Sequence, residues 1–156
     1  MSGAGAAIVS PGEGDVRQNG CLHRFSASPE QTRVVLAEVV QGLDSCGASP
    51  ETRGNVEIVL AEAINNVVEH AYAGDGGLVE LRVCKRDAWL ECEIVDWGVC
   101  MPGMVVPRSR MPRLDRGFEH VPEGGFGWSL IRSLAVDLAY GRHDGHNLLQ
   151  FRIPLT

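Results

Sequence analysis

Three polar residues recur at every fourth position of the stretch EAINNVVEHAY: Glu62, Asn66 and His70. In a helix, a step of four residues leaves an angular offset of only about 40°, so one stripe is expected to carry all three. A carboxylate one turn before an amide oxygen offers the hard oxygen ligands that Mg²⁺ prefers, with water and phosphate completing the shell. The carboxylate could instead orient or deprotonate an attacking hydroxyl. A solvated helix face is the alternative without chemistry.

An acidic residue ends the apolar run LECEIVD and is followed by Trp97 and Gly98. A carboxylate at the end of a buried strand, here Asp96, needs a hydrogen-bonding partner, and the exocyclic amine of a nucleobase is a suitable donor. The glycine would let the backbone pass close to a flat ring. An Asx-turn opened by Asp96 is the alternative interpretation.

Small residues precede the last helical segment in GGFGWSL, which contains Gly125, Phe126 and Gly127. Free N–H groups and the helix dipole at such a junction favour an anion such as phosphate. The stretch is not a P-loop, because the G-K-S or G-K-T sequence is missing, and no strand immediately precedes it as in a dinucleotide fingerprint. Taken alone, glycines at a loop-to-helix junction more often reflect ordinary chain geometry.

The elements that position these residues follow from start signals and hydrophobic period. Ser28-Pro29-Glu30 and Ser49-Pro50-Glu51 begin two helices, and the second is expected to end near Tyr72, where AGDGG breaks it. Alternating apolar residues predict a strand at 21–27, a hairpin within 77–98 and a closing hairpin from VDLAYGR and LLQFRIPL. The order β-α-α-β-β-loop-α-β-β predicts a two-layer α+β sandwich: a mixed, mostly antiparallel sheet with helices on one face.

The bulk properties exclude several classes of protein. The 156 residues suffice for one domain, and the net charge of −6 argues against broad nucleic-acid binding. No apolar run approaches the roughly 20 residues of a membrane span, and the N-terminus lacks the features of a signal peptide. We therefore expect a cytoplasmic protein with no membrane partner and a flexible tail at 1–20. The five cysteines have no C-x-x-C pair, which predicts reduced structural thiols.

The three polar segments together resemble the motifs of the GHKL ATPase superfamily, whose fold is the Bergerat ATP-binding fold. E-x-x-x-N-x-x-x-H resembles the N-box, Asp96-x-Gly98 the first glycine box and Gly125-x-Gly127 the second. The resemblance covers residues 21–156, with an ATP lid at about 101–124. Within the superfamily the chain is similar to the anti-sigma-factor serine kinases of bacterial partner switching, which carry E-A-x-x-N-x-x-x-H-A-Y. One departure is Cys100, where members often have a second glycine.

The resemblance implies roles for the N-box and the lid. Asn66 would ligate the Mg²⁺ that bridges the ATP phosphates, and Glu62 would act as general base or orienter for a protein hydroxyl. His70 would support the site at the nucleotide edge. The resemblance leaves open which lid arginine would neutralise γ-phosphate charge; the candidates are Arg108, Arg110, Arg113 and Arg116.

The glycine boxes are implied to hold the nucleotide. Asp96 would accept a hydrogen bond from the adenine amine, with Gly98 beneath the ring. Gly125 and Gly127, with Phe126 between them, would present N–H groups to the phosphates.

The function implied by the resemblance is that of an ATP-dependent serine/threonine-protein kinase. Its substrate would be a STAS-type anti-anti-sigma protein, a sigma factor is a further expected partner, and the chain would form a homodimer. A non-catalytic nucleotide-binding or partner-docking module of the same fold is the alternative. The catalytic half of a sensor histidine kinase fits less well, because the chain has no room for a helix pair bearing a phosphoacceptor histidine.

Overall fold

The structure is a computed structural model that describes residues 20–107 and 126–156. The predicted tail, apart from Gly20, and the lid residues 108–124 lie outside the described residues. The described elements follow the predicted order: β1 (Cys21–Ser26), α1 (Pro29–Ser45), α2 (Pro50–Asn66), β2 (Leu78–Arg86), β3 (Trp89–Asp96), α3 (Phe126–Leu134), β4 (Val136–His143) and β5 (His146–Pro154). A π-helical turn at Val67–Ala71 extends α2, and a 3₁₀ turn lies at Pro102–Met104.

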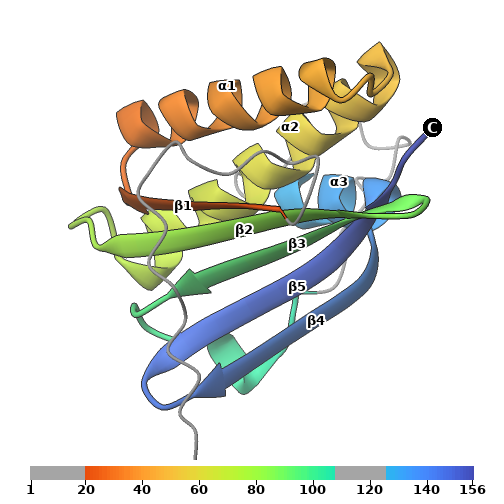
Figure 1. Ribbon diagram of the computed structural model, residues 1–156. Coiled ribbons are helices and arrows are strands. Elements are labelled where there is room, and N and C mark those ends of the chain that lie inside the picture. Colours follow the sequence, from red (N-terminus) through yellow and green to blue (C-terminus); the bar gives the residue numbers. More distant parts are fainter. Residues whose placement is uncertain (1–19, 108–125) are drawn as a thin grey trace, which may run out of the picture.

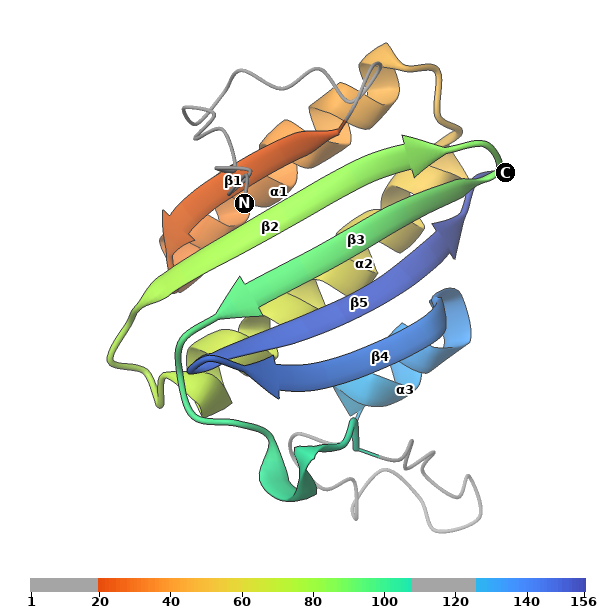
Figure 2. The same cartoon turned by 60° about the horizontal axis from the view of Figure 1, so that its bottom comes forward.

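The fold is the predicted two-layer α+β sandwich, with all three helices on one face of a five-stranded sheet (Figures 1 and 2). The strand order is β1-β2-β3-β5-β4, and α2 packs between α1 and α3. The sheet is antiparallel in all its pairings among the described strands, where a mixed sheet was expected. Strands β3 and β4 run in the same direction and would form a parallel pair if they were neighbours. Strand β5 lies between them and is antiparallel to both.

The core lies between the sheet and the helices. Because strand side chains alternate between faces, each strand sends every second residue to the helices. Cys21, Val83, Cys92 and Phe151 form one such row across β1, β2, β3 and β5, and all are buried. The largest fully buried helix residues are Val39, Leu43, Val56, Val59, Leu60, Ile64 and Ile131.

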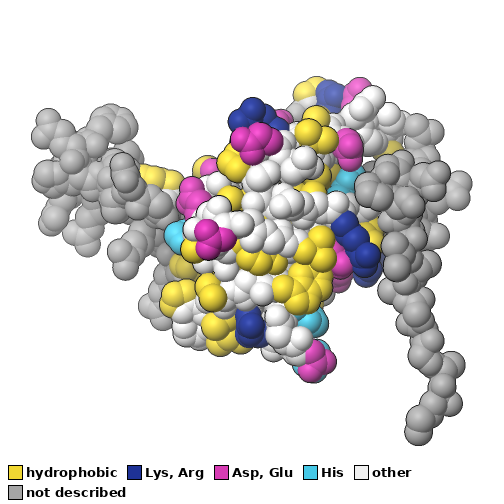
Figure 3. Space-filling model, turned by 90° about the vertical axis from the view of Figure 1, so that its left-hand side faces the viewer, with side chains coloured by type: hydrophobic (Ala, Val, Ile, Leu, Met, Phe, Trp, Pro, Cys, Tyr) yellow, Lys and Arg dark blue, Asp and Glu magenta, His cyan; other side chains and the backbone are white. Residues whose placement is uncertain are grey.

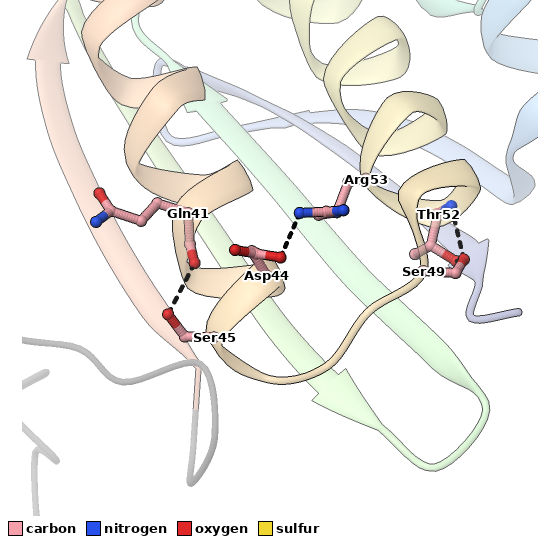
Figure 4. A network of polar contacts seen from close by, with 6 residues as sticks. All are labelled: Gln41, Asp44, Ser45, Ser49, Thr52 and Arg53. Atoms are coloured by element: carbon pink, nitrogen blue, oxygen red, sulfur yellow. Dashed lines mark hydrogen bonds and ion pairs between the residues drawn. The ribbon is translucent and has the colours of Figure 1, made fainter.

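Serine caps begin both long helices, as the sequence predicts. The Ser49 side chain accepts a hydrogen bond from the Thr52 backbone N–H at 3.1 Å (Figure 4), and Ser28 caps α1 in the same way. Arg53 of α2 forms an ion pair with Asp44 of α1 across the connection. These contacts satisfy free N–H groups at the helix starts and fix the angle at which the chain turns from α1 into α2.

All five cysteines lie in the described part of the chain, and no disulfide joins any two of them. Burial raises the pKa of Cys21 to about 11, so this thiol stays protonated and unreactive at neutral pH. Cys100, in contrast, is exposed. No helix among the described residues has both the length and the apolar composition needed to cross a membrane.

A buried histidine joins β1 to α1. His23 is 7% exposed, and its Nδ1 lies 3.2 Å from Oε2 of Glu38. Its Nε2 is buried and has no hydrogen-bond partner among the described residues. Burial lowers the pKa of His23 below its ordinary value of 6.5, although Glu38 acts in the opposite direction. A second N–H on the protonated ring would have no acceptor at Nε2.

We predict that this histidine makes stability pH-dependent. Because its pKa is lowered in the folded state, the unfolded chain takes up the proton first as the pH falls below about 6.5. The free energy of unfolding should therefore decrease with falling pH, with a slope of at most about 1.4 kcal/mol per pH unit from this group. Urea unfolding between pH 5 and 8 measures this slope, and His23→Leu should remove it. If the slope of the wild type were instead smaller than that of His23→Leu, the Glu38 ion pair would outweigh burial.

Candidate active site

The N-box helix and the first glycine box meet at one end of the sheet, where β3 ends and β2 begins (left-hand end in Figure 1). The backbone N–H of Val99 donates to the Ala71 carbonyl at 2.9 Å. The Tyr72 hydroxyl accepts from the Trp97 backbone N–H at 2.8 Å and donates to the Leu78 carbonyl at 2.6 Å. Segments some 25 residues apart in the chain are thus joined by hydrogen bonds.

Gly98 is required by this junction. A Cβ at this position would lie 2.3 Å from the carbonyl oxygen of Ala71 and 2.8 Å from its Cβ. The obstacle is backbone, which cannot move aside without breaking the Val99–Ala71 hydrogen bond. Packing between loop and helix therefore accounts for this glycine, and its expected place beneath a nucleobase stays a prediction.

Asp96 is buried at the end of β3, with 5% of its surface exposed. Its Oδ1 accepts from the Gly98 backbone N–H at 2.9 Å and from Nδ2 of Asn147 at 2.8 Å. The first of these closes the Asx-turn that was one of the two interpretations of Asp96. Burial raises the pKa of this carboxyl, while the two hydrogen bonds and nearby Arg142 oppose the rise. Both bonds use Oδ1, and no described residue donates to Oδ2, which leaves an acceptor for an incoming amine.

Asn147, at the start of β5, organises this loop and was not among the predicted site residues. It is 2% exposed, and its Nδ2 lies within hydrogen-bond distance of Asp96 Oδ1 and of the carbonyls of residues 98 and 99. Its Oδ1 accepts from the Tyr140 hydroxyl at 3.0 Å and from Arg142 at 2.8 Å. A signal was present in the sequence: an amide occupies an inward position of the alternating run NLLQFRI.

Two residues of β4 extend the network to the rest of the loop. The Tyr140 hydroxyl accepts from the Met101 backbone N–H at 2.9 Å, and Arg142 donates to the Gly98 carbonyl at 2.9 Å. The first glycine box is therefore held in place by β3, β4, β5 and the end of the N-box helix together.

The three members of the N-box stripe differ in exposure. Glu62 and Asn66 are half-buried, whereas the His70 side chain is 71% exposed and its Nε2 lies 4.0 Å from Oε2 of Glu69. His70 lies in the π-helical turn, which closes over five residues, from the Tyr72 N–H to the Val67 carbonyl at 3.1 Å. The last member of the predicted stripe therefore does not lie in regular α-helix.

Asn66 and Glu62 fit the requirements of a magnesium site. The amide Nδ2 of Asn66 is buried and has no partner among the described residues. The two ends of an amide are told apart only by their hydrogen bonds, so this side chain is free to present its oxygen to a cation. The described residues contain no group of three or more His, Cys, Asp or Glu placed to hold a metal. Mg²⁺ needs few protein ligands, because it keeps waters and binds substrate phosphates.

The second glycine box approaches the N-box through Gly127, in the first turn of α3. A Cβ built on Gly127 would lie 2.6 Å from Oε2 of Glu62. Phe126, the first residue of α3, is half-buried. Gly125 and the four lid arginines lie outside the described residues.

The beginning of the predicted lid is fixed to α3 by Arg132. Its guanidinium donates to the Pro107 carbonyl at 3.1 and 3.2 Å and to the Val106 carbonyl at 3.3 Å. Residues 106 and 107 are therefore held against the helix at whose start the second glycine box lies. The exposed Cys100 side chain is not packed into the interior at this end.

Exposed apolar side chains surround the first glycine box. Leu78, Trp97 and Val99 are 46%, 43% and 66% exposed. Figure 3 looks at this end of the molecule and shows hydrophobic side chains gathered in the middle of the face. Clusters of this kind mark surfaces that bind a ligand or another protein.

Comparison with known proteins agrees with the motifs. Residues 25–153 match the family model of the histidine kinase-like ATPase domain. Relatives named serine-protein kinase RsbW, from Bacillus cereus (strain ATCC 10987 / NRS 248) and Bacillus mycoides (strain KBAB4), are 25% and 24% identical over 127 residues, which is 81% of this chain and 79% of theirs. These matches confirm the resemblance to the GHKL superfamily and its anti-sigma-factor kinase branch.

A solved structure shows the same fold. The crystal structure of the RsbU and RsbW domains of Rv1364c from Mycobacterium tuberculosis superposes with a TM-score of 0.57 at 17% identity. The match covers 87% of this chain and 32% of that chain, so this protein spans about a third of the longer one.

We predict that Asn147 is the main polar contributor to stability at this end of the sheet. Asn147→Leu removes every hydrogen bond that Asn147 makes: the Tyr140 hydroxyl loses its acceptor and the Val99 carbonyl loses its donor, while the Gly98 carbonyl keeps Arg142. The free energy of unfolding should fall by about 2–4 kcal/mol in urea titrations. The matched control on the same strand is Gln150→Leu, which removes one exposed contact with Glu93 and should cost under about 0.5 kcal/mol. Equal losses in the two variants would contradict the prediction.

Proposed function

Because the chain belongs to the histidine kinase-like ATPase family, we propose that it is an ATP- and Mg²⁺-dependent serine/threonine-protein kinase of the anti-sigma-factor type. The observation that carries the proposal is the convergence of three distant motifs on one helix. The end of the N-box helix bonds to the first glycine box through Val99 and Ala71, and its Glu62 lies against Gly127 of the second.

The base of the nucleotide binds at the Asp96 end. The carboxylate is fixed through Oδ1, and its Oδ2 accepts the hydrogen bond from the exocyclic amine of adenine. Because Asn147 and the Gly98 N–H hold the acceptor in place before the nucleotide arrives, little ordering remains to be done on binding.

The phosphates bind between α2 and the start of α3. Asn66 ligates Mg²⁺, which when bound neutralises charge on the phosphates. Glu62 accepts the proton of the partner's Ser or Thr hydroxyl while that oxygen bonds to the γ-phosphorus. The bond from the γ-phosphorus to the bridging oxygen breaks, and ADP leaves with its electrons. The N–H groups of Gly125 and Gly127 support the phosphates, and His70 borders the site from its exposed position.

The substrate is a STAS-type anti-anti-sigma protein, and a sigma factor is a second partner of the same chain. The names of the relatives, serine-protein kinase RsbW, support protein serine as the acceptor. A phosphate on the acceptor adds about −1.5 to −2 charges, enough to weaken its complexes by repulsion and desolvation. The protein works in the cytoplasm as a homodimer in this proposal.

The proposal predicts transfer of phosphate from radiolabelled ATP to a purified STAS-domain partner in the presence of Mg²⁺. Glu62→Gln keeps the shape of the side chain and removes the base, so transfer should fall at least about a hundredfold. Glu57→Gln, on the exposed face of the same helix, is the matched control and should leave transfer unchanged. Undiminished transfer by Glu62→Gln would remove Glu62 from the base role. ATP binding without transfer by the wild type would favour a non-catalytic module.

A second prediction is that Asp96→Asn changes nucleotide binding without lowering the stability of the fold. The pKa of this carboxyl is raised by burial, so its favourable contribution to stability is present at low pH and is lost as the pH rises through the raised pKa. In Asp96→Asn the new side chain keeps an oxygen for the Gly98 and Asn147 donors and carries no charge. Stability at pH 7 should therefore be equal to or above that of the wild type, as thermal unfolding would measure.

The same variant should lose its preference for adenine. The introduced amide turns an N–H toward the base, where it meets the amine of ATP but can donate to the 6-oxo group of inosine triphosphate. Titration calorimetry should show ATP affinity reduced about 10- to 100-fold and a smaller change for inosine triphosphate. An equal loss for the two nucleotides would contradict direct contact between Asp96 and the amine.

A further inference from the structure

We infer that Gly127 is a positioning residue for the carboxylate of Glu62, an inference that rests on the kinase function proposed above. A Cβ built on Gly127 would lie 2.6 Å from Oε2 of Glu62, but 3.5 Å from its Cδ and 3.7 Å from its Cβ. The carboxylate oxygen therefore occupies the space that any side chain at position 127 would fill. The absence of a side chain lets Glu62 extend across the first turn of α3.

The nature of the obstacle distinguishes this glycine from Gly98. At Gly98 a methyl group would meet the backbone carbonyl of Ala71, which is fixed by a hydrogen bond. At Gly127 the nearest atom is the free end of a flexible side chain. An added methyl group at 127 would therefore turn the Glu62 carboxylate aside without requiring either helix to move.

A displaced carboxylate is sufficient to impair proton transfer. A general base acts only within about 2.6–3.2 Å of the hydroxyl whose proton it accepts. The carboxylate must leave a position that lies 2.6 Å from the added atom, which is shorter than any normal contact. The shift of the Glu62 carboxylate that relieves this contact is comparable to the range of distances over which proton transfer is efficient.

The role is separable from phosphate binding by the backbone. Alanine retains the N–H group that Gly127 would present to a phosphate, and residue 127 lies in helical backbone that alanine adopts readily. If Gly127 acted only through its N–H, Gly127→Ala would be neutral. If it acts by leaving room for Glu62, the variant slows transfer while nucleotide affinity is retained.

The test is a double-mutant cycle with Gly127→Ala, Glu62→Ala and the double variant of the full chain. Steady-state transfer from ATP to the STAS partner should fall at least about tenfold in Gly127→Ala, while the Kd for ATP with Mg²⁺ changes less than about twofold. In the Glu62→Ala background, Gly127→Ala should have no further effect. Gly54→Ala is the control, since it adds a methyl group to α2 with no atom within 4 Å.

Thermal unfolding of the same four proteins tests the contact without reference to catalysis. The change in melting temperature caused by Gly127→Ala should be more favourable in the Glu62→Ala background than in the wild type, because the crowding is gone. Strict additivity, in unfolding or in transfer, overturns the inference. So does a loss of transfer fully explained by weaker ATP binding. A wild type that transfers no phosphate overturns the proposed kinase function instead, and in that case the unfolding cycle decides whether the contact exists.

Discussion

A carboxylate at the end of an interior strand has to be surrounded by hydrogen-bond donors, and this requirement at Asp96 governs the architecture around it. The donors come from the loop that follows, through the Gly98 N–H, and from β5, through Asn147. Asn147 is in turn held by Tyr140 and Arg142 of β4. A single buried charge thus fixes the relative placement of three strands and a loop, because each donor left unpaired would be costly in the interior.

The two ends of the candidate site are built by different means. The Asp96 end is assembled from hydrogen bonds among backbone and buried side chains, so its shape does not depend on a ligand. At the phosphate end, Asn66 has an amide atom with no partner among the described residues, and Glu62 extends into the space that Gly127 leaves open. A rigid acceptor for the base and unpaired groups for the phosphates is the division expected of a site whose ligand carries a large charge at one end.

Local signals in the sequence predicted the local structure well. The Ser-Pro-Glu starts and the alternating strands follow from capping and periodicity, which depend on near neighbours. The placement of the helices on one face was predicted from the order of the elements. The π-helical turn that contains His70 and the antiparallel pairing of all the described strands could not be predicted in this way. The first depends on contact with a loop distant in the sequence, and the second on β5 inserting between β3 and β4. Asn147 was predictable only in part. The alternation in NLLQFRI indicates its inward position, but its hydrogen-bond partners come from three other segments.

The π-helical turn has a physical origin in the junction itself. A helix that ends at the edge of a sheet leaves carbonyl groups without partners, and the glycine-box loop leaves N–H groups without partners. The Val99 N–H and the Ala71 carbonyl satisfy each other, but only if the helix end and the loop approach closely, which Gly98 allows. The wider turn brings the Ala71 carbonyl to the loop at the cost of one regular helical step, and π-turns are often found at functional sites for such reasons. The end of the helix and the glycine-box loop therefore depend on the same contacts, and a change that weakens either one weakens the other.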